Sequence, residues 1–288
     1  MLSYRHAFHA GNHADVLKHV VLIQLLRYFG QKDAPYMYID THAGAGLYAL
    51  DDPFATKLKE YESGIERLWD RDDLPPPLTE YIALIKEMEG NGDRLRYYPG
   101  SPYLAYKIAR QEDRLRLFEL HSTESKILQA NFRKLETDTR KARGKRVIIQ
   151  QTDGLLGLKA LLPPPSRRGL VLIDPSYEDK AEYRLIIDTL ADALKRFATG
   201  TYVVWYPLLQ RLESRQLLEK LKQFAPLPWL NVSLSVNTPS PEGFGMHGSG
   251  MFVLNPPWTL EATLSDVMPY LVGILGQHEQ ASFTLEKG

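Results

Sequence analysis

The sequence predicts an α/β protein: a seven-stranded, mostly parallel sheet with helices on both faces and one small helical insertion. Two observations lead to this class. Short apolar runs alternate with helix-length segments along most of the 288 residues, as expected where helices connect parallel strands. Polar and glycine-containing segments directly follow several of these runs, at the position where open α/β sheets bind ligands.

Seven runs have the length and apolar content of strands. They span residues 36–40, 115–120, 147–151, 169–174, 201–206, 231–237 and 250–255. Most of the later ones are separated by one helix-length segment, which suits parallel βα units. The last two have no helical stretch between them, so we expect them to form an antiparallel pair.

A helix is predicted before the first strand, over residues 15–29. Its apolar stripe consists of Val16, Val20, Ile23 and Leu26, which share one helical face. Three polar residues fall off that stripe at neighbouring positions: Asp15, Lys18 and His19.

The interval between the first two strands is too long for a single crossover helix. Residues 47–98 contain two helical patterns, at 58–69 and 78–88, separated by the three prolines of residues 74–77, which interrupt helices. We therefore expect a main domain, formed by residues 1–46 and 99–288, and an inserted helical subdomain at 47–98.

The composition restricts partners and location. The 35 basic residues balance the 35 acidic ones, so nucleic acid would have to be bound through local patches. Cysteine is absent, which rules out disulfides and thiolate metal sites and fits a reducing compartment. Because the N-terminus is polar and no 18-residue apolar span occurs, we expect a cytoplasmic protein without a membrane contact.

The carboxyl ends of the first three strands carry polar residues in succession. The first strand ends at Asp40 and is followed by Gly44-Ala45-Gly46, the second ends around Glu119, and Asp153 follows the third. A carboxylate can accept hydrogen bonds from both hydroxyls of a ribose, or from the amino group of an adenine. These features predict a pocket for an adenosine-bearing cofactor. Individually, Gly-x-Gly is often only a tight turn, and a strand-end carboxylate commonly caps a helix.

The fourth strand runs into Asp174-Pro175-Ser176-Tyr177. This tetrapeptide resembles the catalytic Asp/Asn-Pro-Pro-Tyr/Phe motif of enzymes that methylate an exocyclic amino nitrogen. Such a nitrogen is a poor nucleophile, and two acceptors beside it, the Asp174 carboxylate and the Pro175 carbonyl, would favour its reactive pyramidal form. Tyr177 would stack on the base. Ser176 replaces the second proline, which removes rigidity but neither acceptor. The alternative is a buried strand that ends in a proline turn.

Longer stretches match one family. They are YRHAFHAGNHADVLKH at 4–19, DTHAGAG at 40–46, YYPGSP at 97–102, RRG at 167–169 and RFATGTY at 196–202. Through them the chain resembles the RlmJ family, S-adenosylmethionine-dependent enzymes that methylate N6 of an adenine in bacterial 23S ribosomal RNA. The resemblance implies a Rossmann-like S-adenosylmethionine-dependent methyltransferase fold, with the main domain as the methyltransferase domain.

The resemblance also implies site residues. The cofactor, S-adenosyl-L-methionine, would contact Lys18, His19, His42, Gly44, Ser101, Glu119, Asp153, Gly154 and Asp174. Among these, the methionine end would meet His19, His42 and Ser101, with Lys18 near its carboxylate. Glu119 would hold the ribose, and Asp153 with Gly154 the adenine. Asp174, Pro175 and Tyr177 would form the catalytic set, while Tyr4 and His6 would close over the substrate RNA.

Competing interpretations remain for several residues. Four histidines lie among the first nineteen residues, but only His9 and His13 have zinc-site spacing, and they lack the accompanying glutamate, so we expect no metal. A second tetrapeptide, Asn255-Pro256-Pro257-Trp258, follows the seventh strand and should lie away from the pocket. Seven positive residues between Arg133 and Arg146 form either a solvated helix face or a phosphate-contact patch. Residues 243–250 form a flexible substrate loop or a long hairpin turn.

The expected partner is 23S ribosomal RNA, with no obligate protein partner. Two other activities would use the same pocket, methylation of DNA adenine and methylation of a protein glutamine. A non-catalytic RNA-binding protein with a relic cofactor fold is the alternative outside enzymology.

Overall fold

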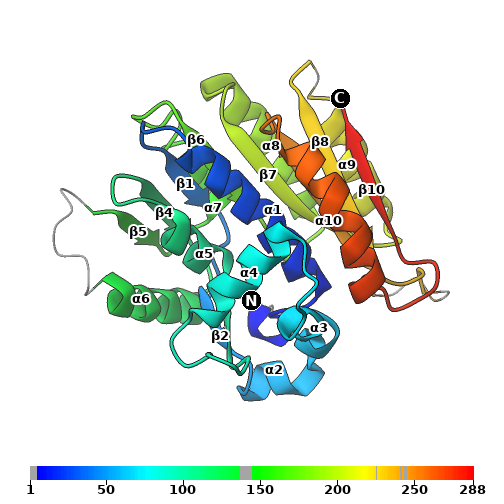
Figure 1. Cartoon of the computed structure of the whole chain (residues 1–288). Coiled ribbons are helices and arrows are strands. Elements are labelled where there is room, and N and C mark those ends of the chain that lie inside the picture. Colours follow the sequence, from blue (N-terminus) through cyan, green and yellow to red (C-terminus); the bar gives the residue numbers. More distant parts are fainter. Residues whose placement is uncertain (1–4, 137–144, 225, 241, 243–244) are drawn as a thin grey trace.

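The computed structural model describes residues 5–136, 145–224, 226–240, 242 and 245–288 (Figure 1). Its main sheet has eight strands in the order β10-β8-β9-β7-β6-β1-β4-β5. They are β1 Met37–Asp40, β4 Arg114–Phe118, β5 Val147–Gln150, β6 Gly169–Ile173, β7 Thr201–Leu208, β8 Trp229–Ser235, β9 Gly248–Leu254 and β10 Ser282–Lys287. The run from β5 to β7 is parallel. β9 runs antiparallel to both of its neighbours, and β10 runs antiparallel to β8.

All seven predicted strands are confirmed, as is the antiparallel pairing of the last two. The predicted number of strands was wrong by one, because β10 adds an edge strand beside β8. Its sequence SFTLEK is mostly exposed and contains only two apolar residues, Phe283 and Leu285. An edge strand needs no buried apolar face, so no apolar run marked it.

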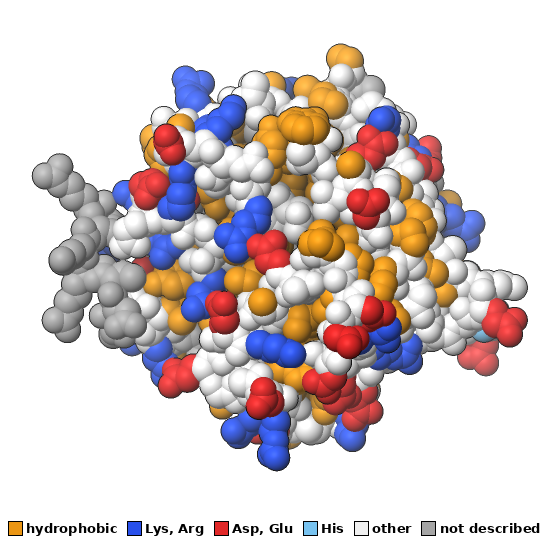
Figure 2. Space-filling view, viewed as in Figure 1, with side chains coloured by type: hydrophobic (Ala, Val, Ile, Leu, Met, Phe, Trp, Pro, Cys, Tyr) orange, Lys and Arg blue, Asp and Glu red, His pale blue; other side chains and the backbone are white. Residues whose placement is uncertain are grey.

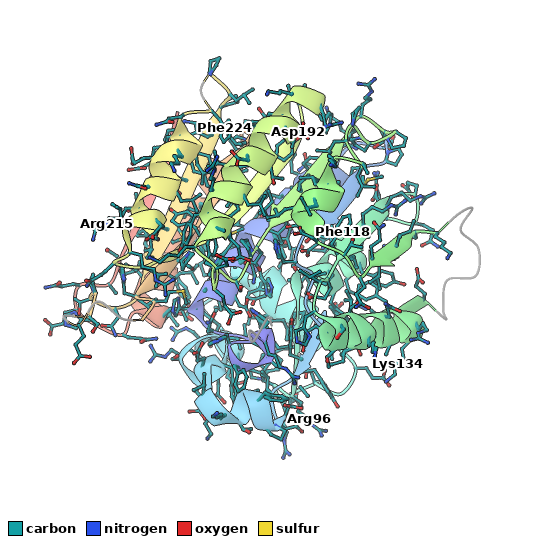
Figure 3. The ribbon with its side chains drawn as sticks, turned by 180° about the vertical axis from the view of Figure 1, so that it is seen from behind. Arg96, Phe118, Lys134, Asp192, Arg215 and Phe224 are labelled. Carbon is teal, nitrogen blue, oxygen red and sulfur yellow. The ribbon has the colours of Figure 1, made fainter. Side chains whose placement is uncertain are left out.

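Helices cover both faces of the sheet. One face is covered by α1 His13–Gly30, α5 Ser101–Ile108, α6 Ser122–Glu136 and α10 Leu260–Leu275, whose apolar side chains form one core cluster. The other face is covered by α7 Gly154–Leu158, α8 Ala181–Arg196 and α9 Leu212–Lys222, which belong to a second cluster. Figure 3 shows this second face, with Asp192 on α8 and Arg215 on α9. Helices on both faces of a largely parallel sheet confirm the predicted α/β class.

The predicted first helix is confirmed as α1. The Asn12 side chain caps it by accepting hydrogen bonds of 3.0 Å from the backbone N–H groups of Ala14 and Asp15, which would otherwise lack partners at a helix start. α1 lies between the sheet and the outer helices, so its polar residues Asp15, Lys18 and His19 are buried along with its apolar stripe.

The insertion differs from its prediction. Its two ends pair as a small antiparallel sheet of β2 Leu47–Ala49 and β3 Tyr97–Pro99. Between them lie α2 Pro53–Leu58, a 3-10 helix η2 at Glu60–Ser63, α3 Glu66–Trp69 and α4 Pro76–Lys86. α4 confirms the second helical pattern. A single helix at 58–69 was wrong, because Lys59 adopts a left-handed φ of 51° that ends α2. The division into two domains stays a prediction.

The order of strands reverses between β1 and β6. Connections from β1 lead on to β4 and β5 on one side, whereas β6 and β7 continue on the other. Such a switch point opens a crevice at the carboxyl ends of the two strands, where α/β proteins bind ligands. Asp40, the last residue of β1, pairs with Leu172 of β6. The segments that follow β1 and β6 therefore begin side by side.

Candidate active site

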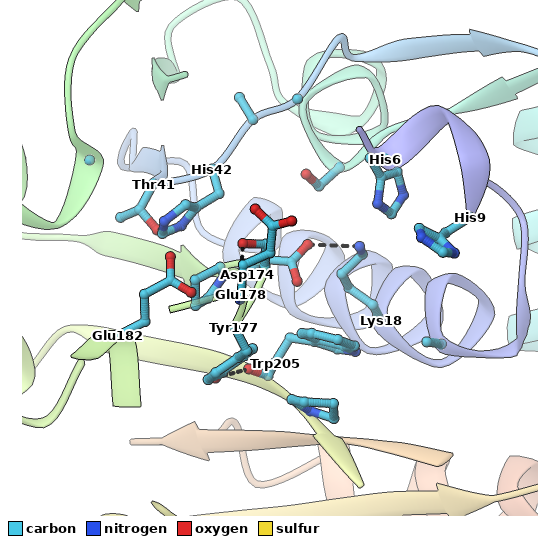
Figure 4. Close-up of a pocket in the computed structure, with 18 of the residues that line it drawn as sticks. His6, His9, Lys18, Thr41, His42, Asp174, Tyr177, Glu178, Glu182 and Trp205 are labelled. Carbon is cyan, nitrogen blue, oxygen red and sulfur yellow. Dashed lines mark hydrogen bonds and ion pairs between the residues drawn. The ribbon is translucent and has the colours of Figure 1, made fainter. Parts of the chain in front are cut away.

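A cavity of about 580 Å³ lies at this switch point (Figure 4). All of the predicted cofactor-binding residues line it, and so do Pro175, Tyr177 and His6. They come from the 3-10 helix η1 (His6–Phe8), from α1, from the start of α5 and from the segments after β1, β4, β5 and β6. Tyr4 lies outside the described residues. The sequence thus identified residues that the fold brings together, while their individual roles stay predictions.

Lys18 joins two carboxylates beside the cavity. Its Nζ lies 2.7 Å from Asp174 Oδ2 and 2.8 Å from Asp15 Oδ1, and Figure 4 shows Lys18 reaching from α1 toward Asp174. Burial disfavours the charged ammonium group, but the charges of Asp15 and Asp174 outweigh it and hold the pKa of Lys18 well above its ordinary value. Lys18 is therefore a fixed cation, with Asp174 Oδ2 as one of its partners.

Asp174 keeps one oxygen available. In the part of the chain that the structure describes, its Oδ2 is held by Lys18, and its Oδ1 accepts no hydrogen bond. Since a carboxylate oxygen has two acceptor positions, Oδ1 can accept from a ligand in the cavity. The Asp174 side chain is 13% exposed, so such a bond would form largely out of water.

Asp40 lies behind the cavity wall and holds residues that line it. It is fully buried, does not line the cavity, and accepts hydrogen bonds from Ser101 Oγ at 2.6 Å, Tyr38 Oη at 2.8 Å and the His42 N–H at 3.2 Å. Burial raises the pKa of Asp40 to about 6, against the effect of these donors. Asp40 therefore fixes two predicted cofactor contacts, Ser101 and His42.

Glu119 is anchored by the backbone of two loops. Its Oε2 accepts a 2.8 Å hydrogen bond from the Gly44 N–H and its Oε1 a 2.7 Å bond from the His121 N–H. Burial raises the pKa of this carboxyl. Gly44 has φ +59°, and a Cβ there would lie 2.3 Å from the Tyr48 hydroxyl oxygen, so the turn requires glycine. Each carboxylate oxygen of Glu119 keeps one acceptor position for a hydroxyl.

Asp153 and Gly154 form the next wall. Asp153 Oδ1 caps α7 by accepting from the N–H groups of Leu155 and Leu156, at 2.8 and 3.1 Å. The helix-cap interpretation is thus correct for Asp153, which also lines the cavity. A Cβ on Gly154 would lie 2.2 Å from the Thr41 carbonyl oxygen. The segments after β1 and β5 can therefore meet only where residue 154 has no side chain.

Two histidines at the cavity are held neutral. Burial lowers the pKa of His19 to about 3 and that of His42 to about 4. His19 Nδ1 lies 2.9 Å from the Tyr98 hydroxyl oxygen, whereas its buried Nε2 has no partner in the described ranges. Buried polar atoms normally have partners. An unpartnered Nε2 on a cavity-lining ring fits a polar ligand at this end of the cavity.

Tyr177 is more deeply packed than predicted. It has a left-handed φ of 56°, only 2% of its surface is exposed, and its hydroxyl donates a 2.6 Å hydrogen bond to the Trp205 carbonyl. Its ring lies 4.6 Å from that of Tyr183 and 5.8 Å from that of Trp205. Ser176 Oγ accepts only a long bond of 3.4 Å from the Glu178 N–H. Tyr177 thus anchors the tetrapeptide, and it presents little surface to a base.

Sequence reasoning missed two residues of this site, Asp15 and Trp205. Trp205 is half-buried, lines the cavity and, within the described chain, has no partner for its indole N–H. Trp205 comes one residue after Val204, which pairs with the last residue of β6, and this places it at the level of the cavity, but no sequence pattern marked it. Asp15 was noted only for falling off the apolar stripe. Burial of a charged residue among apolar ones generally requires a partner.

The second tetrapeptide lies away from the cavity, as predicted. β9 is antiparallel, so its last residue, Leu254, pairs with Tyr202 near the start of β7. The Asn255 amide donates to the carbonyl oxygens of Ala198 and Gly200 at 2.8 and 2.7 Å. Asn255 therefore lies at the opposite end of the strands from the cavity.

The basic stretch is only partly a surface feature. Arg140, Lys141 and Arg143 lie outside the described residues, and Lys145 is exposed. Arg146 is buried, with its guanidinium 4.3 Å from the Tyr106 ring centroid and bonded to the Tyr106 and Ala109 carbonyls, so it is unsuited to a phosphate contact. Figure 2 shows positive and negative side chains interspersed over the face in view.

Three further expectations concern loops, metals and membranes. Residues 243–244 lie outside the described chain, and Gly248 and Gly250 belong to β9, so the last three residues of the expected loop form part of a strand. Met246 lines the cavity. Among the described residues, no group of three or more His, Cys, Asp or Glu side chains is arranged to hold a metal ion. Every described helix is too short or too polar to cross a bilayer.

Comparison with known proteins identifies the family. The sequence profile of "Ribosomal RNA large subunit methyltransferase D, RlmJ" matches residues 33–286. The chain belongs to the RlmJ family. Two relatives named "Ribosomal RNA large subunit methyltransferase J" are 43% identical over 99% of this chain and 98% of the Haemophilus influenzae protein, and 45% identical over 94% of this chain and 93% of the Escherichia coli K12 protein.

A crystal structure of a relative has the same fold. A protein from Legionella pneumophila strain Philadelphia 1 is 40% identical, with a TM-score of 0.86 over 97% of this chain and 98% of that chain. The predicted family, the Rossmann-like methyltransferase fold and the class of enzyme are confirmed. Membership in the RlmJ family implies S-adenosyl-L-methionine as the methyl donor.

Proposed function

We propose that this enzyme transfers a methyl group from S-adenosyl-L-methionine to the N6 amino group of an adenine in 23S ribosomal RNA. The observation that most supports the proposal is the position of Asp174. It ends the strand beside the switch point, its Oδ2 is fixed by Lys18, and its Oδ1 remains available to the cavity. The names of the Haemophilus and Escherichia relatives support ribosomal RNA as the substrate.

The residues around the cavity fit the cofactor. Glu119 offers acceptor positions for ribose hydroxyls, and Asp153 with the Gly154 backbone can hold an adenine. His19 Nε2, Ser101 and the start of α5 suit the methionine end, because helix N-termini favour carboxylates. When bound, S-adenosyl-L-methionine would supply an electrophilic methyl group.

In the proposed mechanism the protein acts by alignment and hydrogen bonding. The target adenine leaves its stack to reach the cavity. Asp174 Oδ1 and the Pro175 carbonyl accept hydrogen bonds from its amino group and direct the nitrogen lone pair toward the methyl group. Such alignment accounts for about 7 to 11 kcal/mol in intramolecular precedents. The nitrogen loses one proton, which passes to Asp174 or to solvent.

The aromatic wall has a separate role. Tyr177 is nearly buried and holds the tetrapeptide against β7 through Trp205. The half-buried Trp205 ring, with its free indole N–H among the described groups, lines the cavity beside it. We therefore assign to Tyr177 the anchoring of the loop, and to Trp205 a share of the contact with the base.

Methyl transfer to separated pools tests the proposal. Purified protein with labelled S-adenosyl-L-methionine should label RNA and leave DNA and protein unlabelled, without added metal or protein partner. Label in DNA or on glutamine would favour the two alternative enzymes. Binding of the cofactor in calorimetry without any transfer would favour a relic RNA-binding protein. Cells lacking the protein should lose one N6-methyladenine from 23S RNA.

A further inference from the structure

Asp15 connects three parts of the site through one buried carboxylate. Its Oδ2 lies 2.9 Å from His6 Nε2 and accepts a 2.9 Å hydrogen bond from the Gly11 N–H. Its Oδ1 lies 2.8 Å from Lys18 Nζ, which in turn lies 2.7 Å from Asp174 Oδ2. A continuous chain of contacts therefore runs from His6 to Asp174.

Each contact in this chain is shielded from water. Asp15 is 1% exposed, Lys18 6% and Asp174 13%, while His6 is 20% exposed at the cavity wall. Charged hydrogen bonds in such surroundings are strong and directional, and removing one partner strands a buried charge. His6 and Lys18 therefore contact the two oxygens of one buried carboxylate.

The N-terminal segment is held at the cavity by contacts on two sides. The 3-10 helix η1, His6–Phe8, has no buried residue, and its outer side meets α2 through Phe8 and Phe54, whose ring centroids are 5.1 Å apart. On its inner side, the 2.9 Å contact of His6 Nε2 with Asp15 Oδ2 attaches it to α1. Asp15 is the point where the segment and the Lys18–Asp174 pair meet.

We propose that Asp15 is a positioning residue that couples the ordering of the N-terminal segment over the target base to the placement of Lys18 against Asp174. The inference rests on the proposed function, because it assigns the base to the space between His6 and Asp174. Asp15 touches neither base nor cofactor in this scheme. It makes closure of the segment and orientation of the Asp174 carboxylate a single event.

Asp15→Asn tests the coupling. The variant keeps the shape but removes the charge shared by His6 and Lys18. It should lower kcat for RNA methylation about 10-fold or more, the scale expected when a reacting group is misplaced, while the Kd for S-adenosyl-L-methionine stays within about 3-fold because the other cofactor contacts remain.

Asp113→Asn is the matched control. Asp113 is also fully buried, and it likewise binds one cation, Arg110, and the backbone N–H groups of Tyr36 and Arg110. It precedes β4, at the opposite edge of the sheet from the cavity. This variant should lose stability yet keep kcat per folded molecule. Wild-type kcat in folded Asp15→Asn protein would overturn the proposal.

A double-mutant cycle tests the coupling without any substitution of Asp15. His6→Ala and Lys18→Met each remove one partner of Asp15, so their effects on kcat/KM for RNA should be non-additive by at least about 5-fold, as for residues in one network. Effects that simply multiply would contradict coupling, even if Asp15→Asn fails to fold.

A third measurement needs no catalytic activity. Trypsin cleavage after Arg5, just before His6, should be several-fold faster in Asp15→Asn and in Lys18→Met than in Asp113→Asn, because opening of the segment controls cleavage. Equal rates would refute the coupling. If the wild-type protein methylates no RNA, the proposed function fails, and the cleavage rates still decide the role of Asp15.

Discussion

The Tyr177 hydroxyl donates a 2.6 Å hydrogen bond to the Trp205 carbonyl, which attaches the tetrapeptide to the neighbouring strand β7. This bond can supply the rigidity that the loop lacks because Ser176 stands in place of the motif's second proline. A second proline would have stiffened the loop from within, whereas here a buried tyrosine fixes it from outside. Rigidity of the acceptors beside the substrate nitrogen therefore depends on Tyr177.

Tyr177→Phe should weaken both stability and catalysis. The change leaves the ring in place but removes the bond to Trp205, so we expect a loss of about 1 to 2 kcal/mol in the free energy of unfolding and a lower kcat. Denaturant unfolding and methyl transfer measure the two effects. Tyr202→Phe is the control, because its hydroxyl binds the Phe197 carbonyl at 2.8 Å, away from the cavity. A similar fall in kcat for both variants would argue against anchoring.

Asp174→Ala should abolish methyl transfer while cofactor binding remains largely intact. The Asp174 oxygens act on the substrate nitrogen, whereas Glu119, Asp153 and Ser101 keep their own hydrogen-bond partners. Single-turnover transfer and calorimetry with S-adenosyl-L-methionine separate the two. Normal turnover would exclude Asp174 as the catalytic acceptor.

Asn255→Ala should lower the stability of the protein and leave methyl transfer unchanged. Asn255 has a left-handed φ of 53° and two amide hydrogen bonds that close the far edge of the sheet. Their loss should cost about 1 to 3 kcal/mol of stability, with kcat per folded molecule unchanged. The comparison requires thermal unfolding and activity at a temperature where the variant is folded. Loss of transfer by folded protein would make residues 255–258 the catalytic tetrapeptide.

Gly154→Ala should damage the cofactor site. The added Cβ would lie 2.2 Å from the Thr41 carbonyl oxygen, so the segments after β1 and β5 must separate. We expect cofactor affinity to fall at least about 10-fold, equivalent to 1.4 kcal/mol. Gly273→Ala, inside α10 with no atom within 4 Å of its Cβ position, should instead stabilise the protein by about 1 kcal/mol. If Gly154→Ala binds S-adenosyl-L-methionine with unchanged affinity, the cofactor does not contact this part of the cavity.

The pair of His9 with Glu60 should make stability depend on pH. The hydrogen bond to Glu60 raises the pKa of His9 above 6.5. Burial raises the pKa of Glu60, but His9 outweighs burial and brings it below 4.5. The contribution of His9 is complete below pH 6.5 and is lost as pH rises through its folded-state pKa, whereas that of Glu60 is lost as pH falls.

His9→Gln should therefore cost more stability at pH 6 than at pH 9. About a third of each side chain is exposed, so the difference should be modest, about 0.5 kcal/mol. Urea unfolding of both proteins at the two pH values measures it. A larger loss at pH 9 would show that the neutral imidazole makes the important contact.

A buried strand was easier to predict from the sequence than an exposed one. β6 is buried throughout as GLVLI, and its apolar run is unmistakable. β10 is exposed on most positions, so no selection for apolar residues marked it. The helix predicted at 58–69 failed at Lys59, because a left-handed turn at a lysine has no signature in a periodic pattern.

The site residues that directly follow strands were predictable from the sequence. Glu119, Asp153 and Asp174 follow strands that were correctly placed, so topology alone brought them together. Asp15 and Trp205 line the cavity because of how α1 and β7 pack around it, which one sequence does not reveal. The depth of Tyr177 was also missed, because its hydroxyl bond to Trp205 requires the exact spacing of β6 and β7.

The ion pair of Lys18 with Asp174 has a consequence for folding. The two residues are 156 positions apart in the chain, and contacts of such separation form slowly because a long loop must close first. The cavity is therefore completed late, after most helices and strands have formed. During refolding, helical circular dichroism should recover before the ability to bind S-adenosyl-L-methionine. On the ribosome, a chain that is still being made cannot bind its methyl donor until β6 has emerged and paired with β1.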